Sequence, residues 1–104
     1  MAKYVLAYRG GSMAETEAEQ KAVMDQWMGW FGTLGAAVID GGAPFGPAKT
    51  VESNGGVADG GSAALTGYSI IDAVSLDDAA SKAKGCPVLS SGGSVDVYEA
   101  IDMG

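Results

Sequence analysis

Residues 67–84 read GYSIIDAVSLDDAASKAK, and this stretch decides the fold class. Its first eight residues are rich in aromatic and β-branched side chains, which predicts a strand from Gly67 to Val74. Ser75 with Asp78 has the spacing of a capping box, so a helix begins directly after the strand. A Gly-Cys-Pro sequence then ends this helix at about Lys84.

The remaining sequence predicts a similar alternation of strands and helices. Outside the central stretch we expect a strand over Lys3–Arg9, a helix over Thr16–Leu34, a strand over Ala37–Asp40 that resumes at Lys49–Glu52, a loop over 53–64, and a strand over Ser94–Ala100. The first strand is apolar on both faces, which is typical of a central position in a sheet.

The first helix has two possible start signals and one predicted buried face. Thr16 with Glu19 and Ser12 with Glu15 both match a capping box. The residues predicted to be buried are Val23, Trp27, Trp30, Phe31 and Leu34. Gly29 and Gly32 lie on one stripe of this helix, which predicts close approach to another backbone.

The element order β-α-β-β-α-β predicts an α+β fold of the ferredoxin-like type. Two helices would cover one face of a four-stranded antiparallel sheet and leave the other face open. The strands are apolar on both sides, and a monomer tolerates only a few hundred Å² of exposed apolar surface. We therefore expect a homodimer that packs sheet on sheet, as a dimeric α/β barrel.

Composition narrows the function classes. The length of 104 residues predicts one domain, 1–104. The chain has 13 acidic and 6 basic residues, so its net charge is −7, and this negative charge disfavours nucleic-acid binding. Histidine is absent, so the commonest general base and metal ligand is missing; we expect no metal site and no cofactor. One cysteine, Cys86, fits a reducing compartment, and no apolar run reaches the roughly 18 residues of a membrane span. We expect a cytoplasmic protein with no membrane partner.

Three stretches together resemble the YCII-related family, which includes the DGPF proteins. They are the strand–helix stretch 67–79, the segment 84–97 with its Lys-Gly-Cys-Pro and Gly-Gly-Ser-Val-Asp-Val sequences, and the segment 35–47 with Asp-Gly-Gly and Pro-Phe-Gly-Pro. The resemblance implies a dimeric α+β barrel. Some members resemble enzymes that pair a histidine of the first helix with an aspartate, whereas this helix offers Met24, Trp27 and Met28.

Asp40 is the best catalytic candidate, because a carboxylate in an apolar cleft can act as an acid or base. The alternative is a turn aspartate that binds its own backbone. The candidate ligand-binding residues are Tyr8, Arg9, Trp27, Asp40 and Tyr68. For the aromatic members of this set, the alternative is core and dimer packing.

Two further motifs have plain structural interpretations. The segment Arg9–Ser12 has the form of an anion-binding turn before a helix, but the glutamates that follow would repel an anion. Cys86 follows a helix C-terminus, where the dipole raises a thiol pKa and disfavours a nucleophilic role.

Three functions remain open from the sequence. The first is a homodimer that binds a small, mostly apolar molecule between sheet and helices. The second is a lyase or isomerase with Asp40 as acid or base and a tyrosine hydroxyl assisting. The third is a protein-interaction module that uses the loop 53–64.

Overall fold

A four-stranded antiparallel sheet forms the centre of the molecule. The computed structural model describes residues 2–11, 16–60 and 65–103. The strands of this sheet are β1 (Ala2–Arg9), β2 (Val38–Pro44), β5 (Leu65–Ala73) and β6 (Ser94–Ala100). They lie in the order β2-β5-β1-β6, so β1 has the central position that its apolar faces predicted.

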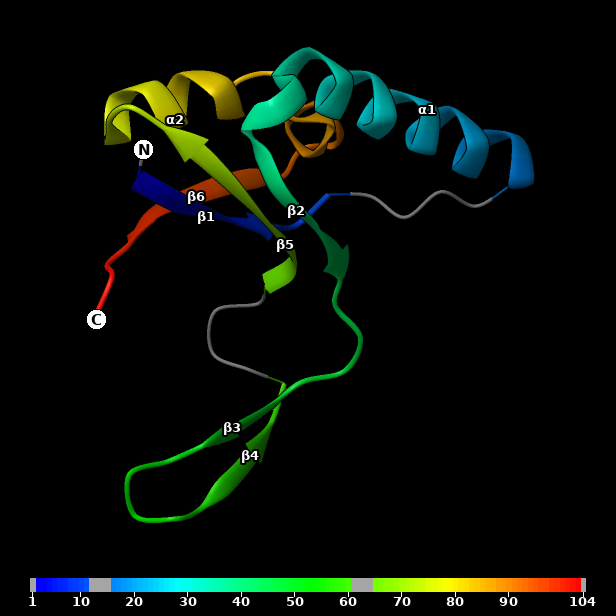
Figure 1. Ribbon diagram of the computed structural model, residues 1–104. Coiled ribbons are helices and arrows are strands. Elements are labelled where there is room, and N and C mark those ends of the chain that lie inside the picture. The colour runs from blue at the N-terminus through cyan, green and yellow to red at the C-terminus, as the bar shows by residue number, and fades with distance from the viewer. Residues whose placement is uncertain (1, 12–15, 61–64, 104) are drawn as a thin grey trace.

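Two helices, α1 (Glu17–Leu34) and α2 (Leu76–Ala83), lie on one side of this sheet (Figure 1). Short 3-10 turns, η1 (Gly35–Ala37) and η2 (Pro87–Ser91), precede the two edge strands. The predicted α+β class, with two helices and a four-stranded antiparallel sheet, is therefore confirmed.

The core lies between the helices and one face of the sheet. Alternate residues of β1 and β5 point into it, because side chains of a strand alternate between faces. Among the buried apolar side chains of this core are Tyr4, Leu6, Tyr8, Ile71 and Ala73 of the sheet and Trp30 of α1.

α1 begins at the first of its predicted signals but buries less than expected. The Thr16 hydroxyl accepts a hydrogen bond from the Glu19 amide at 3.1 Å, whereas the Ser12–Glu15 signal lies outside the described residues. Within α1 only Trp30 is fully buried, and the prediction for Val23 is wrong, since it is 39% exposed. The physical reason is that the N-terminal half of α1 extends past the sheet (Figure 1).

The predicted close approach at Gly29 and Gly32 is also wrong. A Cβ atom built at either glycine would meet no neighbouring atom within 4 Å. The packing of α1 instead rests on its aromatic rings, which contact one another and Tyr8.

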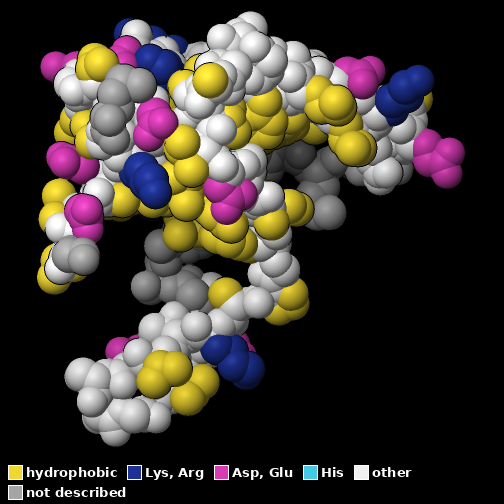
Figure 2. Space-filling model, viewed as in Figure 1, with side chains coloured by type: hydrophobic (Ala, Val, Ile, Leu, Met, Phe, Trp, Pro, Cys, Tyr) yellow, Lys and Arg dark blue, Asp and Glu magenta, His cyan; other side chains and the backbone are white. Residues whose placement is uncertain are grey.

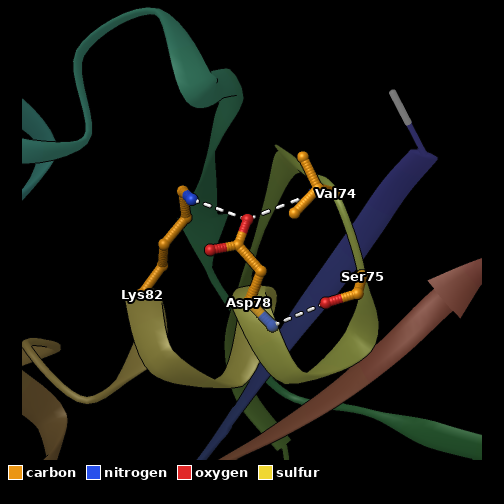
Figure 3. A network of polar contacts seen from close by, with 4 residues as sticks. All are labelled: Val74, Ser75, Asp78 and Lys82. Carbon is orange, nitrogen blue, oxygen red and sulfur yellow. Dashed lines mark hydrogen bonds and ion pairs between the residues drawn. The ribbon is translucent and has the colours of Figure 1, made fainter.

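The start of α2 is held by a small polar network (Figure 3). The Ser75 hydroxyl accepts from the Asp78 amide at 3.0 Å, which confirms the predicted cap. Oδ2 of Asp78 in turn accepts from the Val74 amide at 3.1 Å and from Lys82 Nζ at 2.8 Å. These contacts hold the pKa of Asp78 below its ordinary value, the Lys82 hydrogen bond being the largest cause.

The segment between β2 and β5 departs most from expectation. Residues 49–52 do not resume the second strand; instead β3 (Lys49–Val51) pairs with β4 (Val57–Asp59) in a separate two-stranded sheet. The predicted loop 53–64 therefore contains a strand, while its residues 61–64 lie outside the described part. The tight turn between β3 and β4 has a physical cause, because Gly55 has a φ of +86° and Asn54 Oδ1 accepts from the Gly56 amide.

Candidate functional site

Tyr8 and Trp27, two of the predicted ligand-binding residues, meet in the core. β1 places Tyr8 on the helix-covered face, where its ring contacts Trp27 edge to face at a centroid distance of 5.0 Å. Trp27 also contacts Trp30 and Phe31, at 5.7 and 5.9 Å. These rings occupy the space between α1 and the sheet, so core packing accounts for most of this aromatic cluster.

A buried chain of hydroxyl groups links this cluster to the edge strand β2. The Tyr8 hydroxyl donates to Ser69 Oγ at 2.7 Å, and Ser69 Oγ donates to the carbonyl of Gly41 at 2.7 Å. Ser69 is fully buried, and burial raises the pKa of Tyr8 far above its ordinary value of 10.0. At neutral pH the phenol therefore stays protonated and acts as a fixed donor, not as a proton acceptor.

These groups converge between α1 and β2. We name this place the α1–β2 junction and define it by Tyr8, Trp27, Phe31, Gly41 and Ser69. A Cβ atom added to Gly41 would lie 4.0 Å from the Phe31 ring, so β2 lies directly beside α1 here. Trp27 and Phe31 are only half-buried. The junction is thus an aromatic surface with one exposed border.

Two methionines extend that exposed border along α1. Met24 and Met28 are 64% and 69% exposed. They lie three residues before Trp27 and Phe31 respectively, a spacing that places each pair side by side on a helix. We name Met24, Trp27, Met28 and Phe31 the apolar rim; Figure 2 shows hydrophobic side chains gathered between the helix layer and the sheet.

Asp40 lies at the same edge but is engaged with its own backbone. It is exposed, and its Oδ1 accepts a hydrogen bond from the Gly42 amide at 2.8 Å. β2 is irregular at this point, with register shifts on either side of Asp40. The contact is the one that the turn-aspartate interpretation describes.

Arg9 and Tyr68 lie on the opposite face of the sheet from Tyr8. Tyr68 is the register partner of Ala7, and its ring stacks on Phe45 at 5.7 Å. Arg9 forms an ion pair with Asp96 at 3.2 Å. The five predicted ligand-binding residues therefore do not lie together. Tyr8 and Trp27 belong to the α1–β2 junction, whereas Arg9 and Tyr68 lie on the open face, as does Asp40, which pairs with Ile70.

A shallow groove that sequence reasoning missed lies between α1 and the segment after α2. Its volume is about 510 Å³, and its lining residues are Gln26, Gly29, Trp30, Thr33, Lys84, Gly85, Cys86, Pro87, Leu89 and Ser90. None of the predicted ligand-binding residues is among them. The only sequence signal was the Gly-Cys-Pro break, at which an added Cβ on Gly85 would lie 2.9 Å from the Trp30 ring.

Cys86 offers no nucleophile in this groove. It is buried, and burial raises the pKa of its thiol to about 11, so it remains protonated at neutral pH. The cause is loss of hydration on burial, and not the helix dipole that the sequence suggests. In the segment Arg9–Ser12, which has the form of an anion-binding turn, Arg9 is paired with Asp96, and Ser12 lies outside the described residues.

Within the described residues no three His, Cys, Asp or Glu side chains cluster as metal ligands would. Over the same residues, neither helix combines the length and the hydropathy that a bilayer span requires.

Comparisons with known proteins do not assign this chain. No family model, no curated protein and no solved structure matches it. The resemblance to the YCII-related family therefore stays a prediction.

Proposed function

We propose that this protein is a cytoplasmic homodimer of the YCII-related type that binds a small, mostly apolar molecule at the α1–β2 junction. The fold proposed for each subunit is ferredoxin-like, and the two open sheet faces would pack together as a dimeric α/β barrel. The strand order β2-β5-β1-β6, with the β3–β4 hairpin as an insertion, supports this topology.

The open sheet face is the observation that supports dimerisation. Register places Val5, Ala7, Ile70, Tyr68 and Tyr98 together on the side away from the helices. Tyr98 is 59% exposed, whereas Val5, Tyr68 and Ile70 are half-buried and Ala7 is buried. A second sheet packed on this face would bury it.

The charged groups of the same face nearly cancel, although the chain is strongly acidic. On β1, β5 and β6 they are Lys3, Arg9, Asp72 and Asp96, and the register adds Asp40 of β2, which lies opposite Ile70. Two positive and three negative groups leave one net negative charge here, against −7 for the whole chain. Two copies that approach through this face therefore meet less repulsion than their total charge would cause elsewhere.

The apolar rim supports ligand binding at the α1–β2 junction. Its half-buried aromatic rings and exposed methionines suit an apolar molecule, since methionine adapts its shape to its partner. Tyr8 is only 5% exposed and donates to Ser69 beneath these rings, so the rim offers apolar contact. A small molecule with an apolar body fits this surface.

An enzyme that uses Asp40 is the weaker alternative. Asp40 lies next to Gly41 of the junction, but it is exposed and already accepts the Gly42 amide. Replacement of Asp40 by Asn separates the two functions, because a binding protein would keep its affinity and an enzyme would lose turnover.

Native mass spectrometry tests the proposal first. We expect a species of twice the 10.4 kDa chain mass, carrying an additional small mass. The variant Tyr98→Asp should yield monomers, because it places a charge in the proposed interface. A monomeric wild-type protein would contradict the dimer.

Nile red, a neutral apolar dye, tests the binding surface. Met28→Ser should weaken its binding about tenfold, because the variant replaces apolar area with a hydroxyl at the rim. Met103→Ser is the matched control, since Met103 is 93% exposed near the C-terminus. Equal dye affinity of the two variants would place the binding surface elsewhere.

A further inference from the structure

The shallow groove between α1 and the segment after α2 is separate from the apolar rim. Its volume of about 510 Å³ falls within the roughly 300–1,000 Å³ that is typical of small-molecule sites. It is bordered by the C-terminal half of α1 and by η2, which lies against that helix (Figure 1). None of the four rim residues lines the groove. A ligand bound here would therefore not occupy the α1–β2 junction.

The apolar part of the groove is built around Trp30. This side chain is 6% exposed, and its indole Nε1 donates to the carbonyl of Lys82 at 3.2 Å. A Cβ atom at Gly85 would lie 2.9 Å from the indole ring, so a residue without a side chain lets the segment after α2 lie this close. Pro87 and Leu89 add apolar surface beside the ring, and Leu89 is 42% exposed. The groove therefore offers a firmly held apolar surface.

Gly29 leaves space in this groove. Glycine destabilises the interior of a helix relative to alanine. Neither packing nor backbone conformation requires it here, because an added Cβ would meet no atom within 4 Å and the φ of Gly29 is not positive. Gly29 lines the groove, so a larger side chain at this position would occupy volume that is now open.

The backbone acceptors along the groove are already engaged within the chain. The carbonyls that accept a hydrogen bond there are those of Ser81, Lys82, Ala83, Cys86, Pro87 and Leu89. Two hydroxyls of the lining also donate to backbone carbonyls, Thr33 to Trp30 at 2.6 Å and Ser90 to Pro87 at 2.8 Å. These groups are satisfied without a ligand.

The charged group that borders the groove is the ammonium of Lys84. Lys84 is exposed, and no ion pair within the described residues involves it. Among the described residues none of the lining side chains is acidic, although the chain has 13 acidic residues. Asp25 precedes the lining residue Gln26 on α1 but does not line the groove itself. A cationic ligand would thus find no carboxylate here, whereas an anionic ligand would find one ammonium group.

We propose that this groove is a second binding site, which takes a small molecule with an apolar body and one anionic group such as a carboxylate. The body lies on Trp30, Pro87 and Leu89, and the anionic group lies at Lys84. Burial of the apolar body supplies most of the affinity. The contact with Lys84 is exposed to water, so it adds a severalfold preference for the anion. The site depends neither on the homodimer nor on the apolar rim.

The dye anilinonaphthalene sulfonate, an apolar molecule with one negative charge, tests the groove by fluorescence titration. Gly29→Leu should raise its dissociation constant at least about tenfold, because leucine would fill the groove. Gly32→Leu is the matched control, since an added Cβ there also meets no atom within 4 Å and Gly32 does not line the groove. Its dissociation constant should stay within about twofold of the wild-type value. Equal dissociation constants of the two variants would overturn the site.

Both substitutions replace a helical glycine with a better helix former, so the fold should be retained. Cooperative urea unfolding checks this for each variant and excludes dye bound to an exposed core.

A charge-reversal pair tests the preference for an anion. Lys84→Glu should raise the dissociation constant of the sulfonate dye about fivefold. Lys21→Glu makes the same change in net charge on α1 outside the groove and should raise it less than about twofold. The neutral dye phenylnaphthylamine, which has the same rings without the sulfonate, should bind both variants equally. If Lys21→Glu weakened the sulfonate dye as much as Lys84→Glu, the overall charge would be responsible and the anionic class would be wrong.

Nile red separates the groove from the apolar rim. Gly29→Leu should leave the affinity for Nile red at its wild-type value, because Gly29 is not part of the rim. A variant that lost both dyes to the same extent would indicate one shared site and would overturn the second one. Wild-type protein that binds Nile red and not the sulfonate dye would overturn the groove alone.

Discussion

At Gly42 the backbone has a φ of +77° and runs against the carbonyl of Tyr68. A Cβ atom at this position would lie 1.7 Å from that oxygen, which no rearrangement of a side chain can relieve. The Asp40 carboxylate binds the Gly42 amide and stabilises the same irregular segment. Two residues therefore shape the edge of β2 on which the α1–β2 junction depends.

Gly42→Ala should lower the free energy of unfolding by at least about 2 kcal/mol, through backbone strain and the clash with β5. Urea denaturation measures the change. Gly46→Ala is the matched control, because a Cβ there meets no atom within 4 Å, and it should shift stability by less than about 0.5 kcal/mol. Equal stabilities of the two variants would show that β2 does not have this close approach.

Tyr8→Phe should change how stability depends on alkaline pH. Burial raises the pKa of Tyr8 in the folded state, so its contribution is present below the unfolded value of 10.0 and is lost as pH rises above it. Burial also raises the pKa of Tyr4, which contributes in the same direction. We expect wild-type stability to fall above about pH 10 and to fall less steeply in Tyr8→Phe.

The measurement is the midpoint of urea unfolding between about pH 8 and pH 11. At neutral pH the same variant should cost about 1 kcal/mol, the contribution of the hydrogen bond to Ser69. Parallel pH profiles of wild type and variant would contradict the assignment of this titration to Tyr8.

At the scale of the element, the N-terminus of α2 is stabilised by a capping residue and by negative charge in its first turn. Ser75 caps the backbone, and Asp77 and Asp78 lie at the positive end of the helix dipole. α1 has a similar cap at Thr16 but no basic residue in its last turn. Local signals therefore placed both helix starts, whereas burial along α1 depended on how far the sheet reaches.

Asp78→Asn should flatten the loss of stability in acid. The Lys82 hydrogen bond holds the pKa of Asp78 below the ordinary 3.8, so its contribution is present above that value. It is lost as pH falls through the lower, folded-state pKa. Thermal unfolding between about pH 2 and pH 6 should show a lower melting temperature at pH 6 and a weaker acid decline in the variant.

Asp77→Asn serves as the control for that series, because Asp77 has the same charge in the same turn. If both variants lost the same share of the acid decline, the effect would come from the helix dipole and not from the Asp78–Lys82 contact.

At the scale of the whole molecule, a net charge of −7 opposes association of two copies. Salt screens this repulsion over a Debye length of about 10 Å at 0.1 M ionic strength. The dimer dissociation constant should therefore fall several-fold between about 0.02 M and 0.5 M sodium chloride, as measured by sedimentation equilibrium. Dissociation at high salt would mean instead that ion pairs such as Arg9–Asp96 rearrange across the interface.

The β3–β4 hairpin could not be predicted in full from the sequence. Asn54-Gly55 is a strong hairpin signal, but the three-residue strand at Val57–Asp59 is too short for a visible alternation. The five predicted ligand-binding residues lie on two faces for a related reason. Tyr8 and Arg9 are adjacent in sequence, so a strand sends them to opposite faces, and only the pairing partners reveal which side each occupies.

The sequence by itself determined the α+β class, the two helix caps and the central place of β1, because these follow from local hydrogen bonding and from periodicity. Tertiary structure decided which aromatic residues are buried, where Asp40 directs its carboxylate, and that residues 49–59 form a separate two-stranded sheet. Those features depend on contacts between segments far apart in the chain. Their energies come from shared burial, which no single segment encodes.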